Sequence, residues 1–171
     1  MATRGIVLGV SLGLLYALGF GASSPARAEE DRALNGRYSA TSNGQWATTN
    51  DVYHDEATVR STWTIAMTCT DVVTCAGRVS SDAGWSADIT TTNGEYVVKR
   101  ELTDWEHCAD GSGRTVTGHQ SYRFFPVGPD GYLLPGSQIF AGFDKTAGQS
   151  GACSLNEKLE IAMPFRLERI D

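Results

Sequence analysis

Residues 63–102 alternate between apolar and polar side chains so regularly that they predict two consecutive β-hairpins. Trp63, Ile65, Met67 and Cys69 share one phase, and threonine or alanine fills the positions between them. A strict period of two is typical of a strand with one buried face and one solvated face. The pattern therefore favours a fold built on antiparallel strands.

Two cysteines fix the register of the first hairpin. When Cys69 is paired with Cys75 across the intervening loop, Ile65 lies opposite Val79 on the same face. Directly opposed residues of an antiparallel pair have Cα atoms about 4.5 to 5.5 Å apart, which a disulfide can bridge. The alternation and the sulfur bond thus predict the same register.

The second hairpin turns at Asn93-Gly94. This dipeptide is typical of a type I′ turn, in which both central residues need a positive φ. The register that follows places Ile89 opposite Val98, and Trp85 opposite Leu102.

Further strands are predicted on both sides of this centre. Alternation covers residues 37–41, 114–125 and 159–168, and a broken extended segment covers residues 132–143. Asn43-Gly44 is interpreted as another hairpin turn. Strands in hairpin succession with no long crossover predict an all-β fold, an up-and-down antiparallel β-barrel of about eight strands. A two-sheet β-sandwich is the alternative.

The N-terminus has the three parts of a secretory signal. Arg4 is followed by an apolar run over residues 6–20, and Ala26-Arg27-Ala28 offers a small-x-small cleavage site. We expect a signal helix that is cleaved, so that no stable membrane span remains, with an uncleaved anchor as the alternative. The expected organisation is a signal peptide at 1–28, a mobile leader at 29–34 and a single disulfide-stapled β domain at 35–171.

The cysteines and the charge point to the same location. Four cysteines follow the signal, and an even number in an exported chain favours the disulfides Cys69–Cys75 and Cys108–Cys153. The sequence contains no C-x-x-C motif, which argues against a zinc site. Loss of the two arginines of the signal changes the net charge from −6 to −8, which argues against nucleic acid as a partner. We expect a protein that is secreted or held in the bacterial cell envelope.

Three segments resemble a known group of proteins. Together with the signal peptide, the Trp63-Thr64-Ile65-Ala66-Met67-Thr68-Cys69 strand, the Cys75-Ala76-Gly77-Arg78-Val79 return and the Met163-Pro164-Phe165 ending are similar to those of small exported mycobacterial proteins of uncharacterised function. The resemblance implies an envelope or secreted location, and it carries over no catalytic residue. Leu34-x-Gly36-x-Tyr38 is also loosely similar to the opening of lipocalin-like barrels, where Gly-x-Trp is usual.

Aromatic side chains share the inward phase of several strands. Such residues usually fill the core of a small barrel, but a barrel of eight strands can also leave room for one small apolar ligand. Arg100 shares this phase, and either reaches solvent at a barrel mouth, which we prefer, or meets an anionic ligand head. The residues predicted to bind a ligand are Tyr38, Trp63, Trp85, Arg100, Gln120 and Tyr122.

Catalytic chemistry finds little support in the sequence. Asp51, His54, Asp55 and Glu56 form an acidic connection whose neighbouring side chains point apart on an extended chain, so we expect no metal there. We expect no cofactor and no catalytic residue. The hypothesis is a non-enzymatic domain that binds an envelope protein or a small apolar ligand. An enzyme using the His54 or His107 loop and a purely structural envelope protein are the alternatives.

Overall fold

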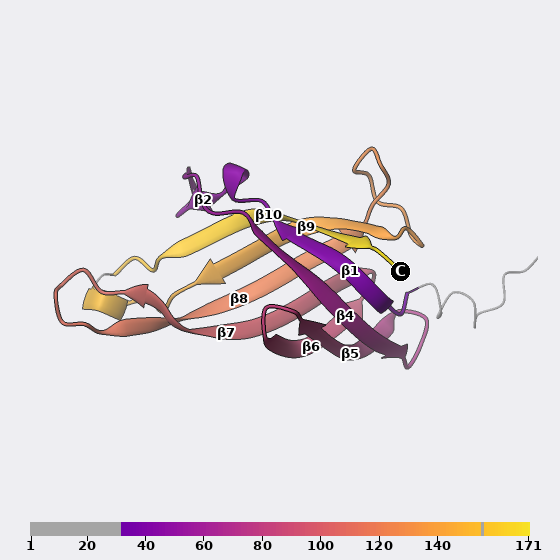
Figure 1. Ribbon diagram of the computed structural model, residues 1–171, viewed down its shortest axis with the longest axis horizontal. Coiled ribbons are helices and arrows are strands. Elements are labelled where there is room, and N and C mark those ends of the chain that lie inside the picture. The colour runs from indigo at the N-terminus through magenta and orange to yellow at the C-terminus, as the bar shows by residue number, and fades with distance from the viewer. Residues whose placement is uncertain (1–31, 155) are drawn as a thin grey trace, which may run out of the picture.

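The part of the chain that the structure describes is a closed barrel of eight antiparallel strands with almost no helix. The computed structural model describes residues 32–154 and 156–171, so the expected signal helix at 1–28 lies outside the described residues. The ring closes where the first strand pairs with the last, with Tyr38 opposite Arg169. The prediction of an up-and-down barrel is confirmed (Figure 1). Its strands are β1 (Asn35–Ser42), β4 (Val59–Cys69), β5 (Thr74–Ser81), β6 (Trp85–Thr92), β7 (Glu95–His107), β8 (Thr115–Pro126), β9 (Ile139–Ala147) and β10 (Glu160–Arg169).

The expected hairpin at Asn43-Gly44 is wrong. After β1 the chain makes a short 3-10 turn, η1 (Gly44–Trp46), and continues as β2 (Thr48–Thr49), which pairs antiparallel with β10 as β1 does. The chain therefore keeps its direction, and the reversal comes later, between β2 and β3 (Val52–Tyr53). A Cβ at Gly44 would lie 2.0 Å from the carbonyl oxygen of Glu56, so the close approach of that chain requires glycine.

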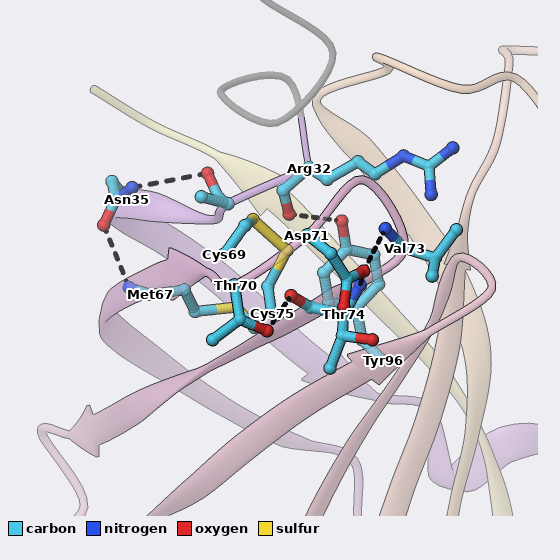
Figure 2. Close-up of a disulfide and its surroundings, with 11 residues drawn as sticks. Arg32, Asn35, Met67, Cys69, Thr70, Asp71, Val73, Thr74, Cys75 and Tyr96 are labelled. Carbon is cyan, nitrogen blue, oxygen red and sulfur yellow. Dashed lines mark hydrogen bonds between the residues drawn. A yellow bond between two sulfur atoms is a disulfide. The ribbon is translucent and has the colours of Figure 1, made fainter. Parts of the chain in front are cut away.

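The first central hairpin has the predicted register. Cys69 pairs with Cys75 and Ile65 with Val79, and a disulfide joins the two cysteines (Figure 2). Beyond the disulfide, the Asp71 carboxylate accepts hydrogen bonds from the main-chain N–H groups of residues 73 and 74, each at 2.8 Å. These hydrogen bonds hold the pKa of Asp71 below its usual value.

The second central hairpin is only partly as predicted. Asn93 and Gly94 both have positive φ, and Ile89 pairs with Val98. The ladder between β6 and β7 ends at this pair, so the expected pairing of Trp85 with Leu102 is wrong. From there β6 stays paired with β5 and β7 with β8, and the two strands diverge as the barrel wall curves.

The β7–β8 hairpin extends beyond the end of the barrel (Figure 1), and a disulfide holds its tip. The second expected disulfide joins Cys108, just after β7, to Cys153 in the 3-10 turn η2 (Ala152–Ser154). A bulge between Leu102 and Glu106 turns Trp105 toward the barrel. A Cβ on Gly118 would lie 2.7 Å from the Trp105 ring, so the indole covers this end of the barrel.

Side chains from all eight strands fill the interior. Gly142 pairs with both Phe124 and Phe165 on the neighbouring strands, and a Cβ there would lie 1.9 Å from the carbonyl oxygen of Arg123, so β8 approaches too closely for any side chain. Among the residues the structure describes, no helix is long and apolar enough to cross a membrane. The largest fully buried side chains are Trp63, Tyr38, Phe124, Phe140, Ile65, Ile89, Leu167, Val79 and Val98.

Candidate functional site

The predicted ligand-binding aromatics form the packed centre of the barrel. The Trp63 ring lies 4.9 Å from Tyr122, 5.3 Å from Trp85 and 5.2 Å from Phe165, measured between ring centroids. Trp63 and Tyr38 are each only 1% exposed. Tyr38 is the cross-strand partner of Trp63 in the same core, and its ring packs on Phe140 with the centroids 6.3 Å apart. Edge and stacked ring contacts at these distances are favourable packing, so the rings support one another where a central ligand would lie.

The two predicted polar residues belong to a hydrogen-bonded chain through the barrel. Arg100 Nε donates to Gln120 Oε1 at 2.6 Å, and Gln120 Nε2 donates to Asp144 Oδ1 at 2.7 Å. The Ser42 hydroxyl donates to the second carboxylate oxygen, also at 2.7 Å. The chain satisfies polar groups that would be costly to bury alone.

Asp144 is the acidic residue of this hydrogen-bonded series, and it is not among the site residues predicted from the sequence. It is 2% exposed, and burial raises the pKa of its carboxyl, while hydrogen bonds from Ser42 and Gln120 lower it in part. The alternation along β9 could have identified it. Phe140, Gly142 and Asp144 share the inner face of the strand, where an apolar residue is expected in place of an acid.

An apolar pocket lies at one end of the barrel, beyond the aromatic core. It has a volume of about 180 Å³ and is lined mainly by apolar side chains. Tyr96 and Phe140 form its floor where the core ends, because both are buried and both pack on Phe124. The wall is formed by Arg32, Asn93, Gly94, Phe125, Pro126, Leu133, Pro135, Gly136 and Ser137.

Main-chain contacts hold the rim of this end pocket. The Tyr96 hydroxyl donates to the carbonyl of Arg32 at 2.7 Å (Figure 2), and Leu34 is buried beside it. The last residues of the expected 29–34 leader therefore pack against the barrel. Burial raises the pKa of Tyr96 to about 12. The N–H of Asn93 donates to the carbonyl of Val73 at 3.3 Å, which links the rim to the loop closed by the first disulfide.

The loop at 127–138 carries exposed apolar side chains next to the end pocket. It projects from the barrel between β8 and β9 (Figure 1), where Ser137 Oγ donates to the carbonyl of Val127 at 2.6 Å. Tyr132, Leu133 and Leu134 are 77%, 69% and 49% exposed, and Leu133 also lines the pocket. Adjacent exposed apolar residues are a recognised mark of an interaction site. The sequence signal was an apolar triplet between Gly131 and Pro135, where turns are usually polar.

The residues considered for catalysis lie on exposed segments. His54 Nδ1 is 2.9 Å from Glu56 Oε1, and the His54 side chain is exposed while that of Glu56 is partly buried. His107 is exposed at the end of β7. Within residues 32–154 and 156–171, no three His, Cys, Asp or Glu side chains are placed together to hold a metal ion.

Comparison with known proteins identifies the fold class. No protein-family model and no curated protein matches the chain. Among solved structures, the chain is similar to the monomeric form of the PknI sensor domain of M. tuberculosis, with a TM-score of 0.56 and 14% sequence identity. The match covers 81% of this chain and 88% of that one. Both are therefore β domains of one overall fold, and at this identity the likeness extends to the fold alone.

Proposed function

We propose that this chain is a non-enzymatic binding domain that works outside the cytoplasm and takes a small apolar group in the end pocket. The observation that carries the proposal is the combination of a filled aromatic core with an apolar space at one end. Small-molecule sites are mainly apolar concavities with a few polar groups that set orientation. Here Arg32, Asn93 and Ser137 supply the polar groups at the rim.

Location outside the cytoplasm is supported by three independent features. The two disulfides persist in oxidising compartments, and the sequence begins with a secretory signal pattern. The sensor domain of a mycobacterial kinase has the same overall fold, which agrees with the mycobacterial resemblance of the sequence. A sensing or carrying role in the envelope is the function that these features favour.

The size of the pocket limits what it can hold. An apolar cavity of about 150 Å³ accommodates benzene, so a space of 180 Å³ suits one ring or the end of a short acyl chain. Each buried methylene contributes about 0.8 kcal/mol, so five or six methylenes would supply about 4 to 5 kcal/mol. The exposed Tyr132 and Leu134 side chains would cover the part of the ligand that leaves the pocket.

A neutral fluorescent probe tests the pocket. N-phenyl-1-naphthylamine, which brightens in apolar surroundings, should bind the wild-type protein saturably, with its phenyl ring in the pocket and its naphthyl group against the exposed side chains of Tyr132 and Leu134. Leu133→Asp replaces an apolar wall with a charge and should weaken binding about tenfold, since about 1.4 kcal/mol is lost. Val52→Asp is the matched control, because Val52 is also 69% exposed but lies on β3, away from the pocket. Absence of saturable binding, or equal losses in both variants, would contradict the proposal.

Native mass spectrometry of protein purified from its own host distinguishes a ligand carrier from a protein-binding domain. A co-purifying small molecule that is lost in Leu133→Asp supports the apolar ligand. A clean apo mass, together with a cross-link from residues 132–134 to an envelope protein, would instead assign the exposed loop to a protein partner.

A further inference from the structure

The wall of the barrel is open between β6 and β7. Their ladder ends at Ile89 and Val98, and beyond this point β6 keeps hydrogen-bonded partners only on β5 and β7 only on β8. The two facing edges thus have no ladder partner over residues 85–88 and 99–102 in the part of the chain that the structure describes. A cleft of about 460 Å³ lies between them, which we call the β6–β7 cleft. Its lining residues are Arg78, Trp85, Ser86, Ala87, Asp88, Lys99, Arg100 and Glu101.

The β6–β7 cleft carries unpaired positive charge in an acidic protein. The carboxylate of Asp88 is 3.0 Å from Arg78, and that of Glu101 is 3.6 Å from His119. Lys99 and Arg100 have no ion-pair partner among the described residues. Two cations that form no ion pair with a described residue therefore line a cleft whose carboxylates already have a neighbouring guanidinium or imidazole, while the chain as a whole has a net charge of −6.

The guanidinium of Arg100 is held in place from inside the barrel. It lies 4.3 Å from the centre of the Trp85 ring, and its Nε is fixed by Gln120. The charge of Arg100 also lowers in part the pKa of Tyr122, which burial raises. In the described part of the chain, no carboxylate forms an ion pair with the guanidinium: the buried Asp144 is joined to Arg100 through Gln120, and the charge of Arg100 acts on Asp144 without a direct contact. A guanidinium has five N–H donors, and these contacts leave some of them for the cleft.

We propose that the β6–β7 cleft binds a small oxyanion, carboxylate or phosphate, through the guanidinium of Arg100. A planar guanidinium held by stacking and by a partly buried hydrogen bond is pre-organised for two parallel N–H···O bonds to such a group. The free main-chain N–H groups on the strand edges add donors within the same cleft. The β6–β7 cleft shares no lining residue with the end pocket, so this site is separate from the proposed apolar one.

Titration followed by nuclear magnetic resonance tests the site with two probes, acetate and inorganic phosphate, at constant ionic strength. The Trp85 indole N–H and the Arg100 Nε–H signals should shift saturably with at least one probe, and sodium chloride should not reproduce the shift. The stronger probe identifies the anion. Signals that change linearly without saturation, or equally with chloride, would overturn the proposal.

Three variants assign the effect to the guanidinium. Arg100→Gln should weaken binding at least tenfold, and Arg100→Lys, which keeps the charge and loses the planar fork, should weaken it several-fold. Arg166→Gln is the matched control, because Arg166 is an exposed arginine on β10 that pairs with Glu168. The Arg100→Lys result decides the matter if Arg100→Gln does not fold. Unchanged binding in a folded Arg100 variant, or an equal loss in the control, would overturn the proposal.

Discussion

Removal of the Cys108–Cys153 disulfide should cost more stability than removal of Cys69–Cys75. The bonds close chain segments with sequence separations of 45 and 6 residues. A cross-link stabilises by restricting the unfolded chain, and the chain-entropy relation gives about 4 kcal/mol for the long segment and about 2 kcal/mol for the short one. Burial predicts the opposite order, because Cys75 is 1% exposed and Cys108 is 8% exposed. The two contributions can therefore be distinguished.

The assay is urea unfolding of two double variants under non-reducing conditions. Cys108→Ala with Cys153→Ala should lose about 2 kcal/mol more unfolding free energy than Cys69→Ala with Cys75→Ala. Both variants should keep the far-ultraviolet spectrum of the barrel. An equal loss, or a larger loss for the short segment, would refute the reasoning that unfolded-chain restriction dominates.

Two further predictions concern the core and the end pocket. Gly142→Ala should destabilise by at least about 3 kcal/mol in urea unfolding, because the added Cβ would lie 1.9 Å from the carbonyl oxygen of Arg123; a loss below 1 kcal/mol would contradict the close approach. The Tyr96 phenol should ionise near pH 12. An absorbance titration of the wild type and of Tyr96→Phe measures this, because the ionisation that is absent from the variant belongs to Tyr96. Since the folded pKa lies above the usual value of 10.0, the contribution of Tyr96 to stability is complete below pH 10 and is lost as the pH rises to about 12. A Tyr96 that ionises near pH 10 in the folded protein would contradict its burial.

The sequence predicted the barrel because its strands are half-buried. Alternation placed Trp63 and Ile65 inside, and Cys69–Cys75 and Asn93-Gly94 fixed where the hairpins turn. Both kinds of signal are local, so they can be interpreted without knowing the rest of the fold. The same local rule failed at Asn43-Gly44, where contact with the carbonyl of Glu56, and not a reversal of the chain, requires the glycine.

The candidate sites were less predictable because they depend on residues far apart in the sequence. The end pocket brings Arg32 and Asn93 together with Phe140, and no periodicity relates these positions. The β6–β7 cleft arises where the ladder between these two strands ends, and the pairing rules for a single hairpin do not predict where a ladder ends. Alternation placed both Arg100 and Gln120 on the inner face, where they form a hydrogen bond. It could not relate them to Asp144, the other partner of Gln120, because Asp144 lies two strands away from Arg100.

The most direct test of the central claim is a crystal structure under xenon pressure, because xenon enters apolar cavities. A filled core with one apolar space at the end predicts xenon density between Tyr96, Phe125 and Phe140, and none around Trp63. Leu133→Asp should reduce the occupancy at this place, while Val52→Asp should leave it unchanged. Xenon among the rings of Trp63, Tyr122 and Phe165, or absence of xenon from the end pocket, would contradict the account.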